Sequence, residues 1–313
     1  MLMDQPIHDT QSNSFNSSAR TIAAGDLEAV FLPDKGMIGA SLRHRGVELL
    51  RRIEDLELAA AKGSTAGIPL LYPWANRLSG FQYSVAGRDV ILDDSSPLLH
   101  LDDRGLPMHG VPWALLAWNV TEARKDSLAA YLDWSNGDLL AIFPFRHRVE
   151  LAATIFPDSL VLNTKLVATS DHPVPVSFGF HPYFGLPDSQ RGAWSLQLPA
   201  MQKLVLDSRG IPTGEEEPFD GYDSELGDNS FDDCFAVRSS NPSFSLSGAG
   251  RKITVEFLAG YEYAQIFAPK TKDYVALEPM TAPTNALTSG RGLSFVEAGG
   301  SLHSSFRIRI EMI

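Results

Sequence analysis

The sequence predicts an all-β protein, a large antiparallel β-sandwich. Two observations indicate this. Apolar and polar residues alternate along several segments, and clusters of Gly, Pro, Asn and Asp separate these segments at intervals of about ten residues. A chain of 313 residues is long for one domain but compatible with a single all-β domain. No repeat of fixed period is visible, which disfavours a propeller.

The alternation is clearest in residues 145–155, where one face would carry Phe145, His147, Val149, Leu151, Ala153 and Ile155. Residues 159–169 show the same period, with Leu160, Leu162, Thr164, Leu166 and Ala168 on one face. Residues 252–257 and 306–313 also alternate. The clearest helix candidate is short and covers residues 51–62. Strands joined by turns therefore account for most of the sequence.

The chain is expected to contain one folded domain, residues 21–313, after a disordered tail of residues 1–20 that is rich in Ser, Asn and Gln. The N-terminal residues lack the basic start and apolar run of a signal peptide. No apolar run is long enough for a membrane span. The single cysteine, Cys234, excludes an intrachain disulfide and is expected to be a buried small residue. A cytoplasmic location is therefore expected.

The formal net charge is −12, from 26 basic and 38 acidic residues. This balance argues against nucleic acid and against an anionic membrane surface as partners. A neutral small molecule fits better. The sequence has no P-loop, no G-x-G-x-x-G after a strand, no G-x-S-x-G and no H-E-x-x-H. We therefore expect no nucleotide cofactor, and the function must come from residues that the fold gathers.

Two candidate acid/base residues each precede a proline. Glu278 follows the apolar segment DYVAL and precedes Pro279, which is expected to hold the carboxylate extended at a strand end. It is either a solvated strand-end residue or a general base. His181 lies in the segment FGFHPYF. It is either a core histidine or an acid/base group in a cleft.

Further polar residues lie in turn-like segments. His109 precedes Gly110, which suggests a close approach of two backbones. Asn76 and Arg77 follow the strand-like segment IPLLYPW, and this pair suits the recognition of sugar hydroxyls. Asp232 and Asp233 lie between aromatic residues, where either could cap a turn or accept from a hydroxyl.

Taken together, these segments resemble the aldose 1-epimerase (galactose mutarotase) family. The resemblance rests on five motifs in family order: GIPLLYPWANRLSG (67–80), His109-Gly110, the segment HPYF from His181, the FDDCF segment, and Glu278 before PMTAPTN. It runs from about residue 25 to the C-terminus.

The resemblance implies a β-sandwich with a sugar cleft on one sheet. It implies Glu278 as general base, His181 as general acid and His109 as a second imidazole, while Arg77, Asn76 and Asp232 bind hydroxyls. The reaction would interconvert the α and β anomers of a free aldohexose such as galactose or glucose. The base would take the C1 hydroxyl proton and the acid would protonate the ring oxygen from the opposite side. This chemistry needs no metal or cofactor, and the protein would be a monomer or homodimer.

Three alternatives remain at this point. The substrate could be a hexose 6-phosphate, which would require basic residues beyond Arg77. The chain could be a sugar-binding protein without catalysis on the same fold. The side chains of His109, His181 and Glu278 could instead hold a metal ion.

Overall fold

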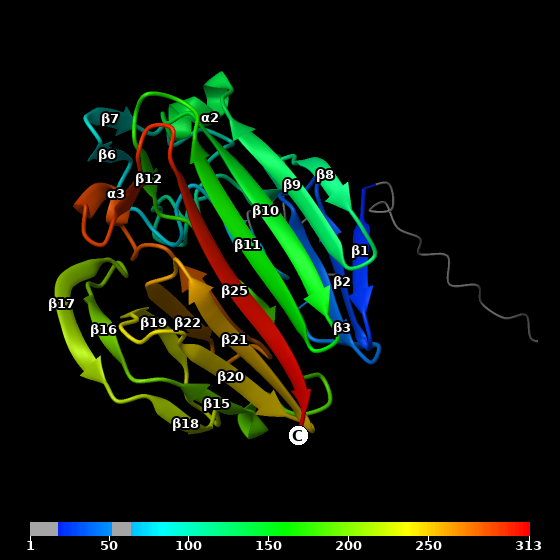
Figure 1. The fold of residues 1–313 in the computed structure, drawn as a ribbon. Coiled ribbons are helices and arrows are strands. Elements are labelled where there is room, and N and C mark those ends of the chain that lie inside the picture. Colours follow the sequence, from blue (N-terminus) through cyan, green and yellow to red (C-terminus); the bar gives the residue numbers. More distant parts are fainter. Residues whose placement is uncertain (1–17, 52–63) are drawn as a thin grey trace, which may run out of the picture.

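The computed structural model describes residues 18–51 and 64–313, and Figure 1 shows that long antiparallel strands dominate it. Within these residues the largest sheet has nine strands in the order β18-β15-β20-β21-β25-β11-β10-β9-β8. Their bounds are β8 (Asn119–Ala123), β9 (Ser127–Trp134), β10 (His147–Phe156), β11 (Ser159–Ala168), β15 (Ser195–Leu198), β18 (Tyr222–Glu225), β20 (Ser243–Gly248), β21 (Arg251–Ala259) and β25 (Ser301–Met312).

A second sheet has eight strands among the described residues, in the order β17-β16-β19-β22-β23-β13-β5, with β14 also paired to β23. Their bounds are β5 (Leu70–Leu71), β13 (Gly179–Phe180), β14 (Tyr183–Phe184), β16 (Met201–Leu206), β17 (Pro212–Phe219), β19 (Phe231–Ala236), β22 (Tyr263–Ala268) and β23 (Val275–Met280).

Smaller elements complete the described part of the chain. A four-stranded sheet contains β1 (Arg20–Ala24), β2 (Leu27–Leu32), β3 (Ile38–His44) and β4 (Val47–Glu48). Two strand pairs are β6 (Gln82–Val85) with β7 (Arg88–Ile91) and β12 (Val174–Val176) with β24 (Ser294–Val296). The helices are short: η1 (Trp113–Leu115), α2 (Gly137–Ile142), η2 (Arg191–Ala193) and α3 (Ala286–Ser289).

The two large sheets pack face to face through their apolar residues. Phe180 of β13 and Phe306 of β25 lie with ring centroids 5.1 Å apart. Strand β10 alternates as expected, with its buried residues on the face toward this core. Period-two burial of this kind is what a sandwich requires of each inner face. The prediction of an all-β antiparallel sandwich is confirmed.

Two expectations fall largely on residues that the structure does not describe. Residues 1–17 of the expected tail lie outside the described residues, and β1 begins at Arg20. The expected helix over residues 51–62 lies outside them except for its first residue, Arg51. Among the described helices, none has the length and apolar character needed to cross a membrane.

Candidate functional site

The site lies on the face of the eight-stranded sheet that points away from the main core. Along β23, Val275 and Leu277 belong to the main core, and Glu278 therefore faces the other way. Gln265 of β22 pairs in register with Glu278, and on the other side with Cys234 of β19. Neighbouring strands thus bring polar side chains together on one surface, although the strands are distant in sequence.

Glu278 is only 2% exposed, so it is not a solvated residue. The expected strand end is wrong, because β23 continues through Pro279 to Met280, where Tyr263 and Gly179 pair with it. A proline has no N–H to donate, but its neighbours still complete the ladder. Burial raises the pKa of Glu278 well above its usual value, as does the nearby Asp232, while Arg77 opposes the shift.

His181 follows β13, and its ring stacks on Tyr183 with centroids 4.0 Å apart and planes 13° apart. Its Nε2 lies 3.2 Å from Oε1 of Glu278. Neither that Oε1 nor Nδ1 of His181 has an aligned hydrogen-bond partner among the described residues. A buried carboxylate oxygen without a partner is costly. Both groups therefore have hydrogen-bonding capacity left for a bound molecule.

The protonation of this pair is governed by burial. Burial lowers the pKa of His181 to about 3 and raises the pKa of Glu278. The two shifts favour a carboxylic acid beside a neutral imidazole over an ion pair. The two arrangements hold the same number of protons and differ only in whether one proton lies on the carboxyl or on the imidazole, whose facing atoms are 3.2 Å apart. The pair can thus exchange roles without taking up a proton from water.

His109 and Asn76 are held by a close approach of two backbone segments. The backbone N–H of His109 donates to the carbonyl of Asn76, and the N–H of Asn76 donates to Nδ1 of His109. The proton of the neutral His109 ring therefore lies on Nε2. Gly110 has φ +67°, and a Cβ there would lie 2.2 Å from the carbonyl oxygen of Tyr72. The close approach predicted from Gly110 is confirmed. Burial holds the pKa of His109 well below its usual value, and repulsion by His181, when that ring is protonated, acts in the same direction.

Asp232 and Asp233 lie on opposite faces of β19, because successive side chains of a strand alternate. Asp232 shares a face with Cys234 and accepts a hydrogen bond from Nε2 of Gln265 at 2.8 Å. Asp233 points the other way and pairs with Lys203 at 2.7 Å. Burial raises the pKa of Asp232, and Arg77 opposes this shift. Only Asp232 of the two lines the cavity described next.

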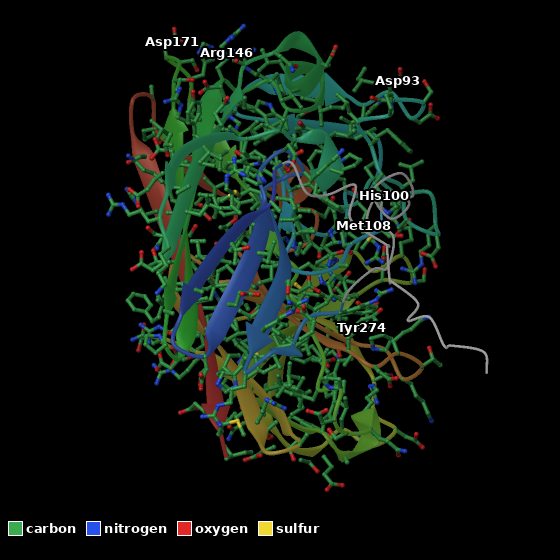
Figure 2. The ribbon with its side chains drawn as sticks, turned by 90° about the vertical axis from the view of Figure 1, so that its right-hand side faces the viewer. Asp93, His100, Met108, Arg146, Asp171 and Tyr274 are labelled. Carbon is green, nitrogen blue, oxygen red and sulfur yellow. The ribbon has the colours of Figure 1, made fainter. Side chains whose placement is uncertain are left out.

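One cavity of about 290 Å³ brings together all six residues singled out in the sequence. These are Asn76, Arg77, His109, His181, Asp232 and Glu278. The remaining lining residues are Arg51, Ser64, Thr65, His100, Met108, Tyr183, Gln265 and Phe267. Figure 2 shows His100 and Met108 close together on one side of the molecule, with Tyr274 below them. The volume is near the lower end for small-molecule sites.

Gln265 and Arg51 are among the polar residues of this cavity that sequence reasoning missed. Gln265 is 4% exposed and joins two predicted residues, since its Oε1 accepts from Nδ2 of Asn76 at 3.3 Å and its Nε2 donates to Asp232. The sequence feature that could have indicated Gln265 is a single amide side chain within the otherwise apolar segment YAQIFA. Arg51 stacks over the ring of Tyr274 at 4.7 Å, and nothing in its local sequence indicates this contact.

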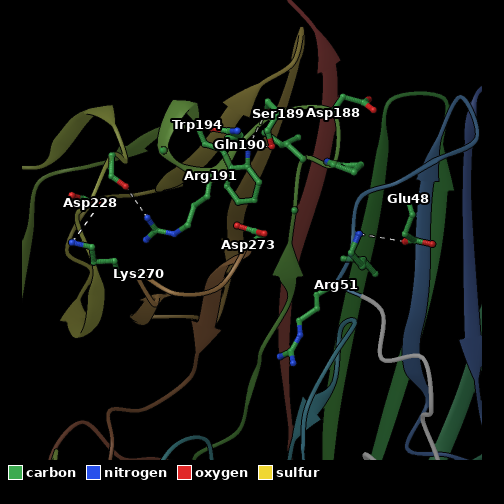
Figure 3. A pocket seen from close by; sticks show the side chains of 16 residues that line it. Glu48, Arg51, Asp188, Ser189, Gln190, Arg191, Trp194, Asp228, Lys270 and Asp273 are labelled. Carbon is green, nitrogen blue, oxygen red and sulfur yellow. Dashed lines mark hydrogen bonds and ion pairs between the residues drawn. The ribbon is translucent and has the colours of Figure 1, made fainter.

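A larger cavity of about 1170 Å³ lies beside the first and shares Arg51 with it (Figure 3). Its charged groups largely satisfy one another: Lys270 pairs with Asp228 at 3.3 Å, and Arg191 donates to three backbone carbonyls. It contains none of the predicted acid/base residues. The smaller cavity is therefore the candidate site, because proton transfer needs titratable groups within reach of the reacting atoms.

His109, His181 and Glu278 line one cavity, but they do not form a metal-binding group. Over residues 18–51 and 64–313, no cluster of three or more His, Cys, Asp or Glu side chains has an arrangement that could hold a metal ion. Cys234 is fully buried, as expected, and burial raises its thiol pKa.

The chain is similar to proteins of a known family. The family model described as aldose 1-epimerase matches residues 22–309. The uncharacterized protein YihR of Escherichia coli K12 is 24% identical over 306 residues, covering 92% of each chain.

Solved structures have the same fold. The Slr1438 protein of Synechocystis has a TM-score of 0.77 at 24% identity, covering 96% of this chain and 99% of its own. A galactose mutarotase-like protein of Clostridium acetobutylicum has a TM-score of 0.81 at 19% identity, covering 94% and 95%. Since the family model spans nearly all of the described residues, the chain belongs to the aldose 1-epimerase family.

Proposed function

We propose that this protein interconverts the α and β anomers of a free aldohexose such as galactose or glucose. The observation that carries the proposal is the buried pair of Glu278 and His181, whose facing atoms lie 3.2 Å apart without an aligned hydrogen bond. Family membership supports a reaction on a sugar. A cytoplasmic location, and a monomer or homodimer, remain predictions.

The adjacency of the pair suits the reaction. The C1 hydroxyl and the ring oxygen of a cyclic sugar are bonded to the same carbon, so a base and an acid that lie close together can reach both. Transfer of the proton from Glu278 to His181 first gives the ion pair. The Glu278 carboxylate then takes the hydroxyl proton, the His181 imidazolium protonates the ring oxygen, and the C1–O5 bond breaks to give an open aldehyde.

Rotation about the C1–C2 bond then presents the other aldehyde face, and closure reverses both proton transfers. Each proton removed is returned, so the pair regains its starting state. The Nε2–H of His109 is the donor placed to stabilise charge near the ring, since its Nδ1 accepts from Asn76. Asn76, Arg77 and Asp232 hold the remaining hydroxyls, and Gln265 fixes the orientation of two of these three.

Replacing Glu278 tests the proposal. Glu278→Gln keeps the shape of the side chain but cannot take a proton, so kcat for anomer interconversion should fall by about 10²–10⁴-fold. Sugar binding should remain. Polarimetry on fresh α-galactose and α-glucose measures the rate, and calorimetry measures binding. A wild-type kcat in the variant excludes Glu278 as base, and a wild-type protein that binds sugar without accelerating the reaction is a sugar-binding protein instead.

One observation favours a second candidate, a hexose 6-phosphate substrate. Arg51 lines the cavity and has no carboxylate partner within the described ranges, so its guanidinium is available to an anion. If the substrate is phosphorylated, Arg51→Gln should lower kcat/KM for glucose 6-phosphate about tenfold or more and leave glucose unaffected. Arg45→Gln, at an exposed ion pair with Asp26, is the matched control. Equal kcat/KM for both sugars, unchanged in Arg51→Gln, excludes this candidate.

A further inference from the structure

Asp102 lies outside the cavity but contacts a residue that lines it. Its side chain is 3% exposed, and its two oxygens have separate partners. Oδ1 accepts from the backbone N–H groups of Arg104 and Leu106, both at 2.9 Å. Oδ2 accepts from Nε of Arg77 at 2.6 Å. One carboxylate therefore joins a tight backbone turn to the guanidinium of a cavity residue.

The turn that holds Asp102 is itself anchored to the site. The backbone N–H of Asp102 donates to the carbonyl of Leu106, and the N–H of Met108 donates to the carbonyl of His100. Met108 and Arg77 are paired through their backbones in an isolated antiparallel β-bridge. Residues 100–109 thus form a hairpin with its turn at Asp102 and with His109 at its far end. The carboxylate is placed by this backbone and not by a mobile side chain.

The carboxylate stays ionised in this position. Burial alone would raise its pKa, but the backbone N–H groups of Leu106 and Arg104 and the side chain of Arg77 together hold it below its usual value. An ionised acceptor makes a strong bond to the guanidinium. At neutral pH Asp102 is therefore ionised and attracts the guanidinium of Arg77.

A second side chain also holds the guanidinium of Arg77. Nη1 donates to Oδ1 of Asn76 at 3.1 Å. Of the five guanidinium N–H groups, those without a protein partner remain for a ligand. The charge of Arg77 also opposes the upward pKa shifts that burial causes at Asp232 and Glu278. The position of this guanidinium therefore affects both hydroxyl binding and the base.

We propose that Asp102 is a positioning residue, which holds Arg77 in the orientation that binds the sugar hydroxyls. Arginine has a long side chain with several rotatable bonds, and a fixed partner at Nε removes most of that freedom before the sugar arrives. The inference rests on the proposed function, since it assigns Arg77 to the substrate. Asp102 itself touches no reacting atom.

A double-mutant cycle on kcat/KM tests the proposal, with Arg77→Ala, Asp102→Ala and the combined variant. Asp102→Ala should lower kcat/KM about tenfold, mainly through a higher KM, because binding geometry and not the acid/base pair is affected. Once Arg77 is absent, removal of Asp102 should have no further effect. Two losses that multiply in the combined variant would overturn the proposal, and so would an unchanged KM in Asp102→Ala.

Two controls separate positioning from folding. Asp133→Ala removes the carboxylate of an exposed ion pair with Arg148 at 2.7 Å on the nine-stranded sheet, and kcat/KM should not change. Asp102→Asn keeps the size of the side chain and replaces the alanine variant in the cycle if the latter does not fold. If the wild-type protein binds galactose without turning it over, the proposed function fails. The same cycle on Kd by calorimetry then decides the role of Asp102, with non-additive losses supporting it and additive losses overturning it.

Discussion

At the residue scale, the site consists of polar groups buried at a cost and left partly unsatisfied. Within the part of the chain that the structure describes, Oε1 of Glu278 and Nδ1 of His181 have no aligned partner, while Asp232, Gln265 and Asn76 form a connected chain of hydrogen bonds. A satisfied network is rigid, and unsatisfied atoms beside it are positions for a ligand. We therefore assign sugar binding to the hydrogen-bonded residues and proton transfer to the two residues with unsatisfied atoms.

The two neighbouring aspartates allow a matched test at this scale. Asp232→Asn should raise KM for galactose about tenfold, because a charged acceptor for a sugar hydroxyl is replaced by a neutral amide. Asp233→Asn changes the adjacent residue, whose ion pair with Lys203 is partly exposed, and should leave KM unchanged. Steady-state kinetics of both variants measure the effect. An elevated KM in Asp233→Asn alone would reverse the assignment.

At the scale of elements, the short strand β13 decides the geometry of the acid/base pair. It lies between β5 and β23, and the residue after it is His181. Gly179 begins this strand, and a Cβ there would lie 2.8 Å from the carbonyl oxygen of Pro279, the residue after Glu278. The absence of a side chain at Gly179 lets the two strands approach, which brings His181 within reach of Glu278.

Gly179→Ala should therefore push β13 away from β23. Crowding of this kind destabilises a core by about 1–3 kcal/mol, and kcat should fall about tenfold or more because the pair is displaced. Thermal unfolding and polarimetry measure the two effects. Gly137→Ala, where a Cβ meets nothing within 4 Å, is the control. A Gly179→Ala protein with normal kcat would show that β13 does not set the position of His181.

At the scale of the whole molecule, a polar contact joins the two large sheets. The hydroxyl of Tyr72, which follows β5, lies 2.5 Å from Nε2 of His147 in β10. Nδ1 of His147 donates to the carbonyl of Phe145 at 2.6 Å, and Trp134 stacks on the ring. Burial lowers the pKa of His147 to about 4, opposed by the bond to Phe145. The folded protein therefore keeps this histidine neutral.

Acid should weaken the fold through His147. Its pKa is near 6.5 in the unfolded chain and about 4 in the folded protein, so the unfolded state binds the proton first. Stability is complete above the unfolded value and falls as pH drops toward 4, by roughly 2 kcal/mol between pH 8 and pH 5. Urea unfolding should show this loss in the wild-type protein. In His147→Gln the loss should be smaller by that amount, and an identical pH dependence would contradict the assignment.

The sequence by itself determined the sandwich and the chemical types in the site. Alternation in residues 145–155 is a local signal, because the strand period is a property of the backbone. The close backbone approach predicted from Gly110 is likewise a local signal, whereas the strand end expected at Glu278 is wrong. The inferences that held depend only on neighbours in the chain.

Only the tertiary structure decided which of these groups meet. The approach of His181 to Glu278 and the presence of Gln265 and Arg51 in the cavity depend on how distant segments pack. The period of two places adjacent residues on opposite faces but does not say which face is the core. That choice is made when distant strands pair, and such pairing is not encoded by any single segment.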